Sequence, residues 1–99
     1  MKKYILLYVV CISVISNAFL VQVGQDIDGE AGTDFSGSSV SLSSDGSVVA
    51  IGAPYNDGIN GNSSGHVRIY SLDEDTWVQV GQDIDGEAGT DASGSSVSL

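Results

Sequence analysis

The sequence predicts an all-β fold of short antiparallel strands, and three observations support this prediction. Ser and Gly contribute 16 and 13 of the 99 residues, and Val and Ile contribute another 20, which is typical of strands joined by turns. Residues 21–42 recur almost unchanged as residues 78–99. One 57-residue period contains four segments with the apolar patterns of strands.

The internal repeat defines the organisation of the chain. Its two 22-residue copies are offset by 57 residues and match at 21 positions, the one difference being Ala92 in place of Phe35. Such a period indicates an array of supersecondary units that bury apolar surface against one another. We therefore expect a fragment of a longer array, with the end of a preceding unit at 19–33, a complete unit at 34–90 and the truncated start of the next at 91–99.

The first half of the complete unit contains two predicted strands. In residues 38–43, small polar residues alternate with apolar ones, a period of two that predicts a half-buried strand. An Asp-Gly pair then predicts a tight turn. Residues 48–51 are continuously apolar, as expected of a strand covered on both faces. Pro54 ends this strand because proline cannot donate to a strand ladder.

The second half contains two more strands after a long polar loop at 55–64. Residues 66–72 alternate, so that His66, Arg68 and Tyr70 share one face, which we expect to meet water or a neighbouring unit. An acidic turn follows, and residues 77–84 form the fourth predicted strand.

Four antiparallel strands in 57 residues are the content of one β-propeller blade. The predicted fold class is therefore an antiparallel four-stranded β-propeller blade, flanked by strands of neighbouring blades at 21–27 and 95–99. Phe35 and Trp77 are expected to be packing anchors between blades.

Several segments resemble the FG-GAP repeats of integrin α-subunit β-propellers, above all residues 34–40, DFSGSSV, and 50–54, AIGAP. Residues 65–70, GHVRIY, stand where that family has its third strand. Residues 77–81 resemble the closing strand of related bacterial and algal surface proteins. The resemblance covers the chain beyond residue 18 and implies a cell-adhesion propeller.

The sequence departs from the family pattern in two places. Ser36 separates Phe35 from Gly37, and the loop in which the family binds calcium is reduced to residues 43–46. That loop offers one carboxylate, whereas Ca²⁺ takes about six to eight oxygen ligands. No cofactor is therefore expected at the inherited position.

The N-terminal 18 residues predict a secretory signal peptide. Two lysines precede an apolar run at 4–15, and Ser16 and Ala18 supply the small residues of a cleavage site before Phe19. An uncleaved signal-anchor is the alternative, since the apolar stretch continues past the site. We expect a secreted or cell-surface protein that is held at a membrane only through an uncleaved anchor.

Charge and composition exclude several classes of function. Without residues 1–18, one Arg faces thirteen acids, a formal net charge of −12. Such a chain cannot neutralise phosphates, so nucleic acid and anionic membrane surfaces are excluded as partners. Cys11 is the only cysteine, which excludes a disulfide framework. No nucleophile has a positioned base, so we expect no enzyme.

An acidic run in both repeat copies is the candidate metal site. Four acids in each copy follow the order of oxygen donors in an EF-hand loop, although glycine stands where a bidentate glutamate belongs. The alternative is that these acids face solvent and cap the next turn. The candidate Ca²⁺ ligands are Asp26, Asp28, Glu30, Asp34, Asp83, Asp85, Glu87 and Asp91.

The polar loop at 55–64 carries two further candidate features. Its Asn and Asp side chains are a second candidate for a cation site, or else simply form the Asx turns of a surface loop. Asn62 begins an N-glycosylation sequon, which has meaning if the source is eukaryotic.

Two function classes stay open from the sequence. The first is a non-catalytic interaction or adhesion module, in which a propeller presents its loops to a protein or glycan partner. The second is a structural, Ca²⁺-binding extracellular repeat whose acids bind the ion. In both classes, other repeats are partners as well.

Overall fold

The computed structural model describes residues 4–5, 8–12 and 18–99, with side chains described from residue 21 onward. The described residues form nine strands and no helix, which confirms the all-β prediction. Consequently, this part of the chain has no helix with the length and apolar character needed to cross a membrane.

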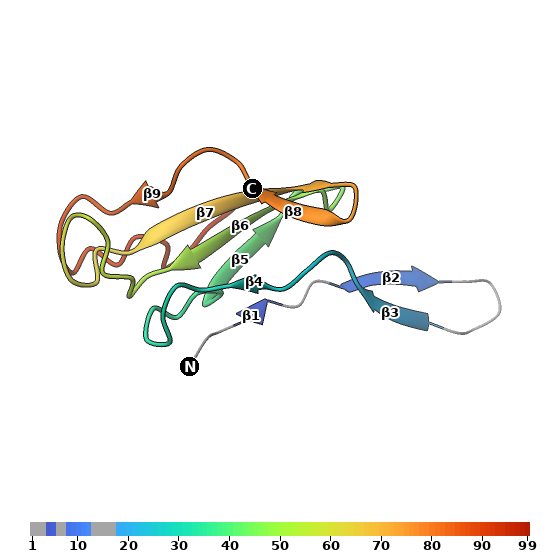
Figure 1. The fold of residues 1–99 in the computed structure, drawn as a ribbon, viewed down its shortest axis with the longest axis horizontal. Helices are drawn as coiled ribbons and strands as arrows, with labels where there is room; N and C mark the ends of the chain where they lie inside the picture. Colours follow the sequence, from blue (N-terminus) through green and yellow to red (C-terminus); the bar gives the residue numbers. More distant parts are fainter. Residues whose placement is uncertain (1–3, 6–7, 13–17) are drawn as a thin grey trace.

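The largest sheet is the predicted four-stranded blade (Figure 1). Its strand order is β5-β6-β7-β8, every neighbouring pair is antiparallel, and β9 pairs with β7 beyond the end of β8. The strands of this sheet are β5 (Ser39–Leu42), β6 (Val48–Ala53), β7 (His66–Asp73), β8 (Thr76–Gln79) and β9 (Ile84–Asp85).

Two small antiparallel pairings precede the blade. β2 (Tyr8–Ile12) pairs with β3 (Ala18–Gln22), and β1 (Tyr4–Ile5) pairs with β4 (Ile27–Asp28). Figure 1 shows the β2–β3 hairpin extending away from the blade.

Much of the predicted signal peptide lies outside the described residues, namely 1–3, 6–7 and 13–17. These include both lysines and the first small residue of the cleavage site. Cleavage before Phe19 stays a prediction.

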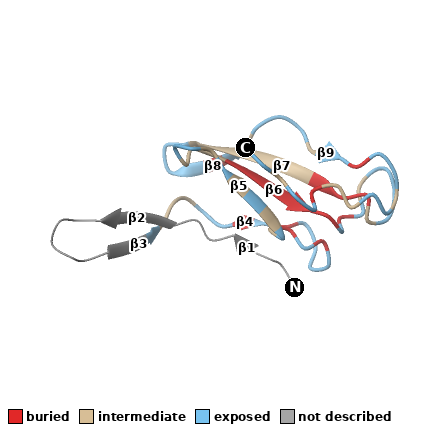
Figure 2. Ribbon diagram, turned by 180° about the vertical axis from the view of Figure 1, so that it is seen from behind, coloured by how far each residue is buried: buried red, intermediate tan, exposed pale blue. Residues whose placement is uncertain are grey.

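β6 is the central strand of the blade and the most deeply buried (Figure 2). Val49, Ala50, Ile51 and Ala53 are all buried, because strands pair with both edges of β6 and the two repeat copies lie against its two faces. The strand runs two residues past the predicted 48–51 before the buried Pro54 follows it.

The first repeat copy covers one face of the blade. Ile27 packs with Val49, Ile51 and Trp77 in the core. The Trp77 indole is 4% exposed, and its Nε1 donates to the Val23 carbonyl at 2.8 Å. Trp77 therefore anchors the first copy to the blade, and its role between neighbouring blades stays a prediction.

The second repeat copy reaches the other face. Successive side chains on a strand point to opposite faces, so Gly52 faces away from the side on which Val49 and Ile51 pack. A side chain at Gly52 would collide with the Gly94 carbonyl, which accepts a hydrogen bond from Ser39 Oγ at 2.7 Å. The central strand is thus held between the two copies.

One glycine in each copy interrupts a strand that the sequence predicts as continuous. Gly24 and Gly81 occupy the same repeat position and have φ angles of 75° and 72°, in the left-handed region that extended strands do not use. The single strands predicted at 21–27 and 77–84 are therefore wrong. Each is split into two short strands, β3 and β4 in the first copy and β8 and β9 in the second.

One further prediction needs correction. Residues 95–99 form no strand, although the Leu99 amide donates to Ser41 Oγ of β5 at 2.9 Å. Phe35 sits in a turn with φ 58°, is 47% exposed and meets the Tyr55 ring edge-on at 5.2 Å. Its role as a packing anchor between blades stays a prediction.

Candidate functional site

Three segments that are distant in the sequence meet at one end of the blade, which we call the loop end (Figure 1). They are joined mainly through the backbone: the Tyr55 amide donates to the Asp34 carbonyl at 3.2 Å, and the Ala92 amide donates to the Ser63 carbonyl at 2.9 Å. The loop end consists of residues 29–38, 54–65 and 86–95.

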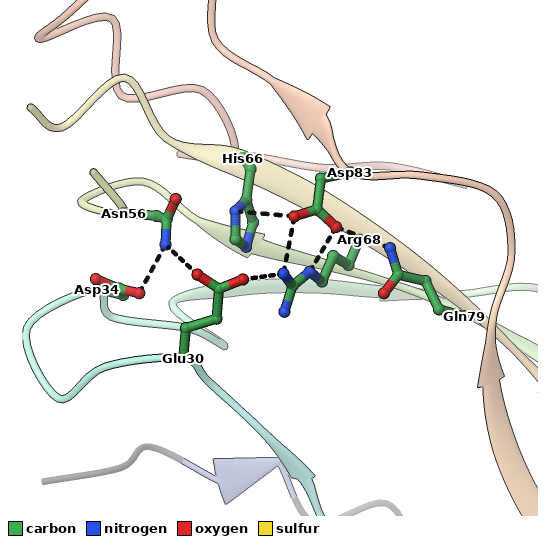
Figure 3. Close-up of polar contacts among 7 residues, drawn as sticks. All are labelled: Glu30, Asp34, Asn56, His66, Arg68, Gln79 and Asp83. Atoms are coloured by element: carbon green, nitrogen blue, oxygen red, sulfur yellow. Dashed lines mark hydrogen bonds and ion pairs between the residues drawn. The ribbon is translucent and has the colours of Figure 1, made fainter. Parts of the chain in front are cut away.

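A polar cluster beside the loop end is built around Arg68 of β7 (Figure 3). The Arg68 guanidinium donates to both carboxylate oxygens of Asp83, from Nε at 2.7 Å and from Nη2 at 2.8 Å. Nη2 also pairs with Glu30. Since Glu30 belongs to the first copy and Asp83 to the second, Arg68 fastens both copies to the blade.

Asn56 extends the cluster into the 54–65 loop. Its Nδ2 donates to Asp34 Oδ2 at 2.8 Å and to Glu30 Oε2 at 3.2 Å. Asn56 and Asp34 are both buried. His66, also buried, places Nδ1 3.8 Å from Asp83 Oδ2.

The Arg68 guanidinium lowers the pKa values of the carboxylates that it pairs with. Hydrogen bonds from Arg68 lower the pKa of Asp83 to about 2, against the opposing effect of partial burial. Burial acts to raise the pKa of Glu30, but hydrogen bonds from Asn56 and Arg68 outweigh it and lower that pKa. The same bonds to Asp83 raise the pKa of Arg68 further. The cluster is therefore a charged network at neutral pH.

Glu30, His66 and Asp83 offer ligand atoms that all lie within 4.8 Å of one another. A metal ion there would have to compete with Arg68, whose guanidinium already pairs with both carboxylates. The geometry of this group consequently favours an ion-pair network.

The structure distributes the eight predicted calcium ligands among several environments. Asp26 accepts from Gln22 Nε2 at 2.8 Å, and Asp91 accepts from the Ala88 amide at 3.0 Å. Glu30, Asp34 and Asp83 belong to the polar cluster. The remaining three, which are exposed, are Asp28, Asp85 and Glu87. Among the described residues, Glu30 and Asp83 approach each other across the two copies, and Glu30 and Asp34 of the first copy share the Nδ2 donor of Asn56. An EF-hand-like site within one copy stays a prediction.

The sequence reasoning missed the polar cluster. It placed His66 and Arg68 on one face of a strand, correctly, but did not identify their partners. One signal was available: Arg68 is the only formal positive charge beyond residue 18, opposite thirteen acids. A single cationic side chain on a strand face attracts the carboxylates of neighbouring segments.

Residues 26–70 match the family model of the FG-GAP repeat. This segment is an FG-GAP repeat. The match runs from the residue before β4 into β7 and includes Glu30, Asn56 and Arg68, whereas β8, β9 and Asp83 lie beyond it. The antiparallel sheet is consistent with an FG-GAP β-propeller blade. No curated protein and no solved structure gives a significant match to the chain.

Proposed function

We propose that this chain is part of a secreted or cell-surface β-propeller that binds a protein or glycan partner, without catalysis, through its loop end. The observation that carries the proposal is the exposure of large apolar side chains on the FG-GAP loops. Phe35 is 47% exposed, Tyr55 52% and Ile59 87%. Aromatic side chains are enriched at interfaces because they bury much area at little entropic cost.

The chemistry around these side chains suits an extracellular ligand. Phe35 and Tyr55 contact each other edge to face, with their rings inclined by 73°, and so form one apolar surface. Asp57, Asn60 and Asn62 are exposed on the 54–65 loop, which also carries Tyr55. An aromatic surface beside amide and carboxylate groups can stack on a sugar ring or pack against a protein side chain while accepting hydrogen bonds.

Export is the part of this proposal that rests on the N-terminal sequence. A leader of two lysines, an apolar run and a small-residue cleavage site directs a chain out of the cytoplasm. The exposed Asn62 is then accessible to glycosylation in a eukaryotic source.

The test is to probe the immobilised full chain with a glycan array and with a panel of extracellular proteins. Tyr55→Ser and Ile59→Ser should weaken binding of the selected ligand by about tenfold or more, as expected for interface anchors. Leu42→Ser is the matched control, because Leu42 is 48% exposed but lies at the far end of β5. Equal losses in the control, or no ligand in either panel, would contradict the proposal.

A further inference from the structure

The first repeat copy binds Trp77 through both its side chain and its backbone. The indole Nε1 donates to the Val23 carbonyl at 2.8 Å. The side-chain amide of Gln25 pairs with the backbone of Trp77: its Oε1 accepts from the Trp77 amide and its Nε2 donates to the Trp77 carbonyl, each at 2.9 Å. Ile27 packs with Trp77 in the core. Residues 23–27 therefore form a tryptophan site.

Two features of the fold make this close contact possible. A Cβ added to Gly24 would lie 2.7 Å from Trp77 Cδ1 and 2.9 Å from Nε1, so the indole lies directly against a residue that has no side chain. β8, which carries Trp77, stands at the end of the strand order β5-β6-β7-β8. Gln25 can therefore reach the backbone of Trp77 from outside the sheet.

The second copy contains the same stretch with the same local structure. β3 and β8 end at the equivalent residues Gln22 and Gln79, and β4 and β9 begin at the equivalent residues Ile27 and Ile84. The glycine between the strands is left-handed in both copies. The second copy therefore holds a tryptophan site at residues 80–84, with the sequence Val-Gly-Gln-Asp-Ile.

This second tryptophan site is open. Val80 is 50% exposed and Ile84 52%, whereas the equivalent Ile27 is 6% exposed. Gln82 is exposed, and a Cβ on Gly81 would meet no atom within 4 Å. Figure 2 shows that the stretch between β8 and β9 is largely exposed. The described chain thus contains one occupied and one open example of the same site.

The open site faces away from the occupied one. Ile84 pairs with Val67, and Val67 pairs with Gly52. Residues paired across a sheet share a face and neighbours along a strand alternate, so Ile84 lies on the face opposite Val49 and Ile51. The single tryptophan of the chain is buried against the first copy on that opposite face. An occupant of the open site must therefore come from elsewhere.

We propose that residues 80–84 bind a tryptophan-bearing edge strand of the type Thr-Trp-Val-Gln, which this chain itself carries at 76–79. Gln82 pairs with the backbone amide and carbonyl of the incoming tryptophan, and the Val80 carbonyl accepts from its indole. These contacts involve no charged group, so the acidity of the chain does not oppose them. The site lies outside the loop end, so this proposal and the proposed function can fail independently.

A short peptide tests the proposal. Acetyl-Thr-Trp-Val-Gln-amide, with fluorotryptophan in place of tryptophan, is titrated with the full chain and observed by fluorine NMR. The peptide is neutral and is not repelled by the acidic chain, whose own tryptophan carries no fluorine. The fluorine signal should shift and saturate, and the amide signals of Gly81 and Gln82 should shift in the chain.

Two equivalent variants distinguish the open site from the occupied one. Gln82→Ala should weaken peptide binding by about tenfold, because two hydrogen bonds to the peptide backbone are lost. It should melt like the parent, since Gln82 is exposed. The matched control is Gln25→Ala, which should leave peptide binding unchanged but lower the melting temperature, since it loses two hydrogen bonds to Trp77.

A modified peptide makes the test independent of how the variants fold. Methylation of the indole nitrogen removes the donor to the Val80 carbonyl and should weaken binding to the parent by about fivefold. The absence of peptide binding, or equal binding to the parent and Gln82→Ala, would overturn the proposal. Weakening by Gln25→Ala alone would also overturn it, because the peptide would then be replacing Trp77 in the occupied site.

Discussion

Arg68 joins more parts of the molecule than any other side chain of the polar cluster. It lies on β7 and pairs with Glu30, before the blade, and with Asp83, after β8. The attraction within such an ion pair adds little net stability, whereas removing one partner destabilises the fold because the other charge is left uncompensated. Removing the guanidinium would leave two carboxylates close together, without a counter-charge.

Replacing Arg68 by Gln should therefore destabilise the fold. The free energy of unfolding, measured with urea at fixed protein concentration, should fall by an amount between two limits. These are about 1 kcal/mol, as for an exposed ion pair, and about 3 kcal/mol, as for a fully buried one. Arg68→Lys keeps the charge but loses the two-pronged contact with Asp83, so its loss should be intermediate.

The same variant should change the dependence of stability on pH. The pKa of Asp83 falls from 3.8 to about 2 in the folded chain, so the folded state binds its proton less readily than the unfolded state does. This contribution is present above pH 3.8 and disappears as the pH falls towards 2. In Arg68→Gln, stability should decline less between those pH values. Parallel profiles for parent and variant would contradict the assigned role of Arg68.

At the scale of elements, the repeated glycine decides where the strands end. Gly24 and Gly81 share a left-handed conformation in identical sequence contexts, but their surroundings differ. A Cβ on Gly24 would lie 2.7 Å from Trp77 Cδ1, whereas a Cβ on Gly81 meets nothing within 4 Å. Comparing substitutions at Gly24 and Gly81 therefore distinguishes the effect of backbone strain, which both share, from the effect of side-chain packing, which differs.

We expect Gly81→Ala to lower the free energy of unfolding by about 1–2 kcal/mol, because a residue with a side chain is strained in the left-handed conformation. Gly24→Ala carries the same strain and must also displace Trp77 from the core, so its cost should be larger by about 1–3 kcal/mol, as for an overpacked site. Thermal unfolding of the two variants at equal concentration measures the difference. Equal losses would show that Trp77 does not pack over Gly24.

The strands of the blade could be predicted because their signals are local. Alternation in residues 38–43 and 66–72 and the apolar run before Pro54 each reflect burial of a single strand. The breaks at the two glycines were not predicted, because apolar residues at Val23 and Ile27, and at Val80 and Ile84, fit one face of a single strand on either side of them. The cluster around Arg68 depends on pairings between Glu30, Asn56 and Asp83, and no local pattern reports contacts across such separations.

At the scale of the whole molecule, a single blade has little interior. Its buried apolar residues come almost entirely from β6, with Ile27 and Trp77 as the contributions from outside that strand. Large apolar side chains that remain exposed along the blade strands include Val40, Leu42, Val78 and Ile84.

These features predict that the isolated chain associates or is partly unfolded. Repeat units of this kind bury a continuous core only when several stack together, and the described β5 edge carries no strand partner beyond β6. An unpaired strand edge beside exposed apolar side chains is a template for intermolecular pairing. Size-exclusion chromatography with light scattering should therefore detect species larger than the monomer, and urea unfolding should be broad and dependent on concentration. A monodisperse monomer with one sharp, concentration-independent transition would show instead that the blade and its two flanking repeat copies form a self-sufficient small β-domain.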